Sequence, residues 1–153
     1  MKSLRNAFTM IELIFVIVVL GILAATALPK MMATRDDAVA SKLASNIMTG
    51  ISEISSYAMS HATVDSNLTV MSNAIASMEN LGDATLSSNK AIVKTASAPS
   101  CVTVSIDNNA TTGIDTLNIT FGNTNNDAKC VGLQSAIDPS EYPMKLRGTS
   151  VRY

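Results

Sequence analysis

The residue types that most often carry chemistry are scarce in this chain of 153 residues. There is one histidine, His61, and there are two cysteines, Cys101 and Cys130. A four-ligand zinc site of Cys and His therefore cannot be built without carboxylates. Serine, histidine and aspartate all occur, but the sequence shows no nucleophile elbow, metal-ligand motif or phosphate-binding loop. We therefore expect no enzyme activity and no resident cofactor.

The overall charge is nearly balanced, with eleven basic and twelve acidic residues and a formal net charge of −1. This balance argues against a broad surface that neutralises phosphates, so nucleic acid is not an expected partner. Hydrophobic residues make up 47% of the chain and charged residues only 15%. The length allows one ordinary domain with an additional segment beside it.

The strongest pattern in the sequence is an apolar run near the N-terminus, which is long enough to form a helix. Leu13–Pro29 contains no charged residue, and a basic lead with Lys2 and Arg5 precedes it. The twenty-two residues from Phe8 to Pro29 would form a helix of about 33 Å, which is roughly the thickness of the bilayer interior. A removable secretory signal is the alternative, but its apolar part is normally shorter. We therefore predict a segment that enters a membrane, with Glu12 at its start.

The residues beyond Pro29 become amphipathic. Apolar side chains recur at steps of three and four, as on one face of a helix: Val39, Leu43, Ile47, Ile51, Ile54 and Ala58. We expect one long helix from about Thr9 to about His61, with a kink rather than an end at Pro29. At the end of this helix, His61 would interact with the helix dipole. The apolar stripe requires a partner from the rest of the chain.

The remaining segments predict a small α+β head. Residues 68–81 have helical spacing, with an N-cap at Asp65, Ser66 or Asn67 and a stop at Gly82. Turn residues then separate the expected strands, which are 91–95, 101–106, 114–121 and 145–153, with 107–113 as a hairpin loop. Residues 122–127 read as a turn, and Asp127 would cap a short helix that ends near Ile137. An antiparallel sheet could cover the stripe of the long helix.

The first thirty residues resemble the prepilin signal of type IV pilins and type II secretion pseudopilins. In that family a short basic leader ends in a small residue, and cleavage exposes a Phe. The fifth mature residue is Glu, the fourteenth commonly Gly and the twenty-second commonly Pro. Counting from Phe8 places Glu12, Gly21 and Pro29 at these positions. One departure is Ala7, where the family usually has Gly before the cut.

The resemblance implies specific roles for these residues. A prepilin peptidase would cut between Ala7 and Phe8 and methylate the new amine of Phe8. Glu12 would pair with the amine of a neighbouring subunit, whereas physics alone allows a charge in the headgroup region that is stabilised by the helix dipole. The stretch from Gly21 to Pro29 would unwind in a filament, although membrane helices also tolerate both residues.

The basic lead should stay cytoplasmic, which places everything beyond Pro29 on the periplasmic side of a bacterial inner membrane. That compartment permits disulfides. Cys101 and Cys130 would then form either a bridge or two buried thiols, and the resemblance to pilins with a disulfide-closed C-terminal loop implies the bridge. The expected division is a leader at 1–7, a transmembrane and assembly helix at 8–29, and a head at 30–153 that includes the amphipathic half of the helix.

We therefore interpret the chain as the precursor of a filament subunit, whose partners are its own copies, other pilins or pseudopilins, the prepilin peptidase, an inner-membrane assembly platform and lipid. Major pilin, minor pilin and pseudopilin all stay open. The alternative is a monomeric membrane-anchored periplasmic binding protein or enzyme.

Some pseudopilins bind calcium near the C-terminus. Loop oxygens that could serve here, without EF-hand spacing, are those of Asp107, Asn109 and Asp115, or of Asn123, Asn126 and Asp127.

Overall fold

The computed structural model of the chain describes residues 8–109 and 114–146. The chain divides into two compact units, which meet in sequence between Asp36 and Asp37. Helix α1 (Met10–His61) runs through both, so the single long helix expected from the sequence is confirmed almost to the residue. The helix continues through Pro29 without interruption.

The first unit contains the N-terminal part of α1. Its side chains are exposed along the whole apolar run, and Phe8, which precedes the helix, is 84% exposed. By length and composition this part of α1 can cross a membrane. It therefore has no apolar partner within the described residues of its own unit.

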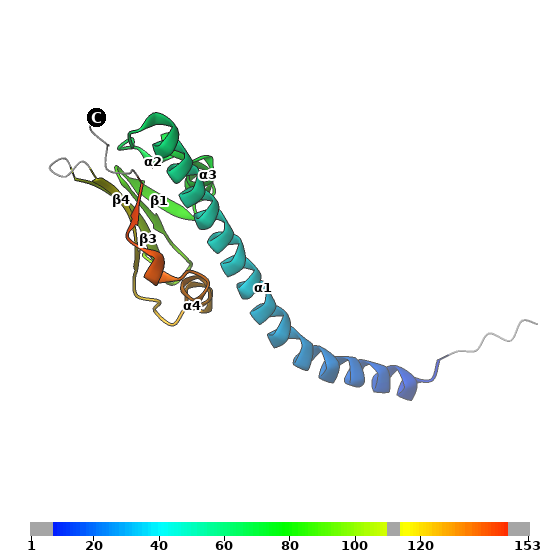
Figure 1. Ribbon diagram of the computed structural model, residues 1–153. Coiled ribbons are helices and arrows are strands. Elements are labelled where there is room, and N and C mark those ends of the chain that lie inside the picture. The colour runs from blue at the N-terminus through cyan, green and yellow to red at the C-terminus, as the bar shows by residue number, and fades with distance from the viewer. Residues whose placement is uncertain (1–7, 110–113, 147–153) are drawn as a thin grey trace, which may run out of the picture. The chain divides into compact units, whose positions relative to one another are not determined.

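The second unit is an α+β head. It contains the rest of α1, two short helices α2 (Leu68–Met71) and α3 (Asn73–Asn80), and a five-stranded antiparallel sheet. The strands are β1 (Ala84–Ser87), β2 (Lys90–Val93), β3 (Val102–Asn109), β4 (Ile114–Phe121) and β5 (Met144–Lys145), paired in the order β1-β2-β3-β4-β5. Helix α4 (Ala128–Ser135) and the 3₁₀ turn η1 (Pro139–Glu141) connect β4 to β5 (Figure 1). The predicted fold class is confirmed.

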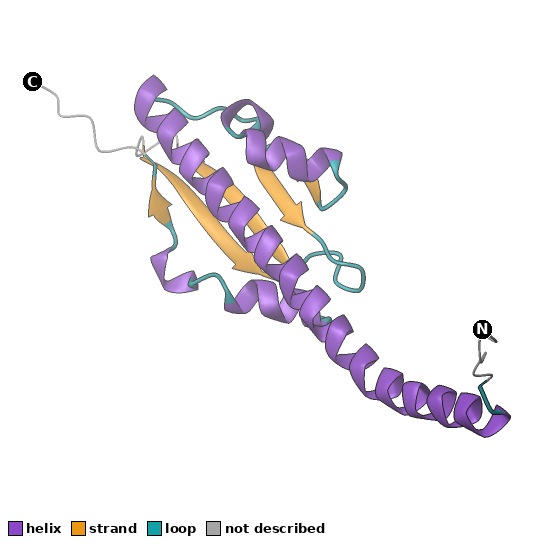
Figure 2. Ribbon diagram, turned by 90° about the vertical axis from the view of Figure 1, so that its right-hand side faces the viewer, coloured by secondary structure: helices purple, strands orange, loops and turns teal. Residues whose placement is uncertain are grey.

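One face of the sheet packs against the second half of α1 (Figure 2). The pairing of Val104 with Ile119 and of Ile106 with Leu117 places apolar side chains on the same face of β3 and β4. Buried residues of α1 include all of the predicted stripe except Val39, which is partly buried: Ala40, Leu43, Ala44, Ile47, Gly50, Ile51, Ile54 and Ala58. The head thus supplies the partner that the stripe requires.

Several predicted boundaries were wrong. Strand β1 was not anticipated, and β3 extends to Asn109, three residues into the expected hairpin loop. The last strand was predicted at 145–153. Within the described residues it consists of Met144 and Lys145 only, and residues 147–153 lie outside the described part of the chain. The helix expected at 68–81 is broken at Ser72, whose side chain instead accepts a hydrogen bond from the N–H of Ile75 and begins α3.

Candidate assembly site

Glu12 lies in the first turn of α1 and is held by the residue three positions before it. Its carboxylate Oε2 accepts hydrogen bonds from the backbone N–H of Thr9 at 2.9 Å and from Thr9 Oγ1 at 2.7 Å. The N–H of Glu12 in turn donates to Thr9 Oγ1 at 3.4 Å. This is a reciprocal capping box, and the Thr-x-x-Glu spacing in the sequence is its signal. The carboxylate is thereby fixed at the N-terminal end of the helix, where the helix dipole favours a negative charge.

The surroundings of Glu12 are apolar and open. Phe8, Ile11, Phe15 and Val16 line a shallow surface hollow beside it. Phe15 is 69% exposed although it lies within the helix. A surface of this kind is stable in lipid or against other apolar helices, but not in water.

Gly21 and Pro29 lie in the same exposed part of α1. A Cβ added at Gly21 would meet no atom within 4 Å, so packing within the chain does not explain the glycine. Pro29 has no N–H to donate to the carbonyl of Ala25, so one hydrogen bond of the helix is missing there. Both residues weaken the helix between them, and their part in assembly stays a prediction.

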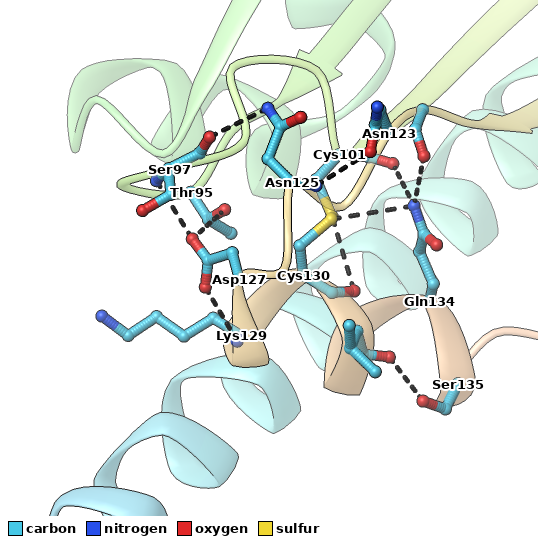
Figure 3. The surroundings of a disulfide bond; sticks show 12 residues. Thr95, Ser97, Cys101, Asn123, Asn125, Asp127, Lys129, Cys130, Gln134 and Ser135 are labelled. Atoms are coloured by element: carbon cyan, nitrogen blue, oxygen red, sulfur yellow. Dashed lines mark hydrogen bonds between the residues drawn. A yellow bond between two sulfur atoms is a disulfide. The ribbon is translucent and has the colours of Figure 1, made fainter.

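The two cysteines form a disulfide in the head, as the resemblance implied. The Cα atoms of Cys101 and Cys130 are 5.7 Å apart, and both residues are fully buried. Gln134 supports the bridge, since its side-chain amide donates at 2.9 Å to the carbonyls of Cys101 and Gly122 (Figure 3). Helix α4 is thereby tied to the ends of β3 and β4. Closing a loop across 29 positions contributes about 3–4 kcal/mol in the chain-entropy estimate.

Asp127 caps α4 as predicted, but it has two further partners that the sequence did not reveal. Its Oδ1 accepts from the N–H of Lys129 at 2.9 Å, and its Oδ2 accepts from Thr95 Oγ1 at 2.8 Å and from the N–H of Ser97 at 3.0 Å (Figure 3). Burial raises the pKa of Asp127, but these hydrogen bonds together hold it below the usual value. Asp127 therefore joins the loop before β3 to the loop after β4.

The residues whose oxygens could bind calcium are either engaged in hydrogen bonds or placed on different faces of the sheet. Asn123 Oδ1 accepts from the N–H of Asn125 at 2.9 Å, and both oxygens of Asp127 are engaged as described. Asp115 is buried on the core face of β4, whereas Asp107 pairs with Thr116 on the other face of the sheet. Among the described residues, no group of three His, Cys, Asp or Glu side chains could hold a metal ion.

His61 ends α1, as predicted. Its Nδ1 lies 3.2 Å from the carbonyl oxygen of Tyr57, one turn earlier, and 2.9 Å from Ser60 Oγ. The rings of Tyr57 and His61 stack with centroids 4.1 Å apart. An imidazole N–H at this position can satisfy a carbonyl that the helix leaves unpaired.

A long N-terminal helix whose second half packs on a small antiparallel sheet defines a pilin-like α+β fold. Residues 2–28 match the prokaryotic N-terminal methylation motif, so the chain carries the prepilin-type signal of type IV pilins and pseudopilins. Proteins with this signal are structural rather than enzymatic. The motif and the apolar helix are consistent with anchoring in the inner membrane. No curated protein and no solved structure matches the chain significantly. Ala7, on the leader side of the expected cut, lies outside the described residues.

Proposed function

We propose that this chain is the precursor of a structural subunit of a type IV pilus or type II secretion pseudopilus, assembled into a filament through its N-terminal helix. The motif at residues 2–28 is the observation that carries the proposal. The exposed apolar half of α1 supports it, because such a surface requires lipid before assembly and neighbouring helices afterwards. The subunit is held in the inner membrane with its head on the periplasmic side until an assembly platform extracts it.

Removal of residues 1–7 by a prepilin peptidase creates a positively charged amine on Phe8, which is then methylated. Glu12 lies four residues further along the chain, and Thr9 holds its carboxylate at the helix start. In a bundle of apolar helices a lone carboxylate is unfavourable, so it pairs with the amine of a neighbouring copy. This pairing sets the register between subunits, and the weakened stretch from Gly21 to Pro29 adjusts to the bundle.

Mass spectrometry of the protein purified from membranes tests the processing step. A mature chain that begins at Phe8 with one added methyl group supports the proposal. A chain that retains Met1 contradicts it, and would indicate instead a monomeric anchored protein of the periplasm.

The charge of Glu12 and its capping role can be separated by two variants. Glu12→Ala removes both, whereas Thr9→Ala removes the cap but keeps the charge. We expect both variants to be inserted and cleaved. Only Glu12→Ala should lose filaments, measured as sheared protein per cell and by electron microscopy. Normal filament yield from Glu12→Ala, or equal losses in both variants, would contradict a pairing role for the carboxylate.

A further inference from the structure

The bond that the prepilin peptidase would cut lies just ahead of α1. Phe8, which supplies the nitrogen of this bond, and Thr9 are not helical, and the helix begins at Met10. The N–H of Leu13 donates to the carbonyl oxygen of Thr9 at 3.3 Å, as expected at a helix start. Thr9 is therefore the N-cap residue, and it determines how close the helix comes to the cut.

The position of the helix start matters for hydrolysis. Water adds to the carbonyl carbon of Ala7 and the C–N bond breaks, which leaves a carboxylate on Ala7 and an ammonium group on Phe8. Within an α-helix this carbonyl would accept a hydrogen bond from the N–H four residues later. Bonds in regular structure are cut from locally opened states, so the rate follows the open population. The bond is therefore cut efficiently only while α1 stops short of it.

The residue types around the cut do little to stop a helix. Ala7 has the highest helix propensity of all residues, and the first glycine and proline of the chain are Gly21 and Pro29. Asn6 is of a type that caps helices, so a helix start one turn earlier, with the cut inside the helix, is available to this sequence. Another feature must favour the later start.

The capping box of Thr9 and Glu12 supplies this feature. In a longer helix the N–H of Thr9 would donate to the carbonyl of Arg5, and the N–H of Glu12 to the carbonyl of Phe8. Instead the N–H of Thr9 donates to Glu12 Oε2 at 2.9 Å, and the N–H of Glu12 donates to Thr9 Oγ1 at 3.4 Å. Growth of the helix across the cut must break both hydrogen bonds.

We infer that the Thr9–Glu12 capping box positions the Ala7–Phe8 bond for the peptidase by ending α1 at Met10. This inference rests on the processing step of the proposed function and gives Glu12 a second task beside assembly. Thr9 and Glu12 are positioning residues here, because they act on the backbone that precedes the helix. A competing helical form lowers the apparent affinity of the peptidase, but it does not slow substrate that is already bound.

Cleavage of the full-length precursor by purified prepilin peptidase in detergent micelles tests the inference, with the loss of residues 1–7 followed by mass. We expect Thr9→Ala to raise KM about five-fold, the population ratio for a lost cap, with kcat little changed. This slower step still reaches completion in growing cells. Thr9→Ser keeps the cap and should behave as wild type. Thr26→Ala is the control, since the hydroxyl of Thr26 binds the carbonyl of Leu23 inside the helix.

The outcomes of this experiment separate the inference from the proposed function. A wild-type KM in Thr9→Ala, a loss confined to kcat, or an equal loss in Thr26→Ala would overturn the inference and leave the proposed function intact. A wild-type precursor that the peptidase does not cut would contradict the proposed function itself.

Ala7→Gly distinguishes positioning from direct recognition of Thr9. Glycine disfavours a helix across the cut by about as much as the cap does. In the Ala7→Gly background we therefore expect Thr9→Ala to change KM by less than about two-fold. The ¹³Cα shift of Phe8 in the uncut precursor should move toward its helical value in Thr9→Ala alone. Equal effects of Thr9→Ala on KM in both backgrounds would show that the peptidase contacts Thr9, and would overturn the inference.

Glu12→Gln separates the two tasks of Glu12. Glutamine can complete a capping box but carries no charge. We expect Glu12→Gln to be cleaved with a KM near that of wild type and yet to form few filaments, whereas Glu12→Ala should raise KM as Thr9→Ala does. A KM in Glu12→Gln as high as in Glu12→Ala would show that the charge, and not the cap, governs cleavage, and would overturn the inference.

Discussion

Glu53 shows how one side chain on the long helix organises another element. Its Oε2 accepts from Ser72 Oγ at 2.7 Å and from the N–H of Ala74 at 3.0 Å. The carboxylate therefore caps α3 from a distant part of the chain, while Ser72 caps it locally. The hydrogen bonds from Ala74 and Ser72 hold the pKa of Glu53 below its ordinary value.

We expect Glu53→Gln to lower the free energy of unfolding by about 1 kcal/mol at pH 7. Because the folded pKa is depressed, the carboxylate stabilises the head above its unfolded pKa of about 4.5 and loses this effect as the pH falls through the folded pKa. The difference between the variant and wild type should therefore shrink in acid. Urea denaturation in detergent micelles measures it. Glu79→Gln, on α3 itself, is the control and should change stability little at pH 7.

Gly122 allows a close approach of two loops beside the disulfide. Its N–H donates to the carbonyl of Cys101 at 2.9 Å, and a Cβ at this position would overlap the carbonyl oxygen of Ser100. We expect Gly122→Ala to lower the free energy of unfolding by about 2–3 kcal/mol, because a backbone atom cannot move as freely as a side-chain end. Thermal unfolding followed by circular dichroism measures the change.

Gly132→Ala is the matched comparison. An added Cβ there would lie 3.1 Å from the Cβ of Ala40, which requires a shift of only a few tenths of an ångström. Its effect should be clearly smaller than that of Gly122→Ala, and the opposite ranking would show that the contact with Ser100 is not the reason for the glycine.

At the scale of elements, α1 is one helix in two environments. Its second half is stabilised by the sheet, whereas its first half has no partner within its own unit. Gly21 costs a helix interior about 1 kcal/mol relative to Ala. With the hydrogen bond lost at Pro29, this makes residues 21–29 the weakest part of the exposed half.

We expect backbone amides between Gly21 and Pro29 to exchange faster than their neighbours in the assembled filament, because a helix weakened at both positions should unwind as subunits pack. Hydrogen exchange with mass spectrometry measures this. The double variant Gly21→Ala/Pro29→Ala restores helix formers and should exchange slowly. Equally slow exchange throughout the wild-type helix would show that it stays intact.

At the scale of the whole molecule, the state of the two cysteines depends on which side of the membrane the head lies. Lys2 and Arg5 are the basic residues ahead of the apolar run, and positive charge retained in the cytoplasm sends the opposite end across the membrane. A disulfide such as Cys101–Cys130 persists in oxidising compartments and is rare in the cytosol, where thiols are kept reduced. Orientation and bridge should therefore change together.

We expect Lys2→Glu/Arg5→Glu to leave a measurable fraction of chains with reduced cysteines, because an inverted head remains in the cytoplasm. Thiol alkylation after rapid acid quenching counts them by mass. Lys42→Glu, a charge reversal within the head, should leave the cysteines bridged. A fully bridged Lys2→Glu/Arg5→Glu protein would show that these two residues do not set the orientation.

The sequence by itself determined the parts of this protein that depend on local pattern. The 3.6-residue period predicted α1, a β-like composition bounded by turn residues predicted β4 to the residue, and Asp127 was found because a cap acts on its own helix. The methylation motif is likewise contiguous, so its residues were readable without a fold.

The tertiary structure decided what depends on distant neighbours. Strand β1 has only four residues and is a weak strand signal by itself. It is stabilised by its pairing with β2, which the local sequence does not reveal. Glu53 reaches Ser72 and Ala74 across 19 and 21 positions, and Asp127 reaches Thr95 across 32. Such contacts follow from how apolar faces pack, and side-chain packing has no fixed spacing along the chain.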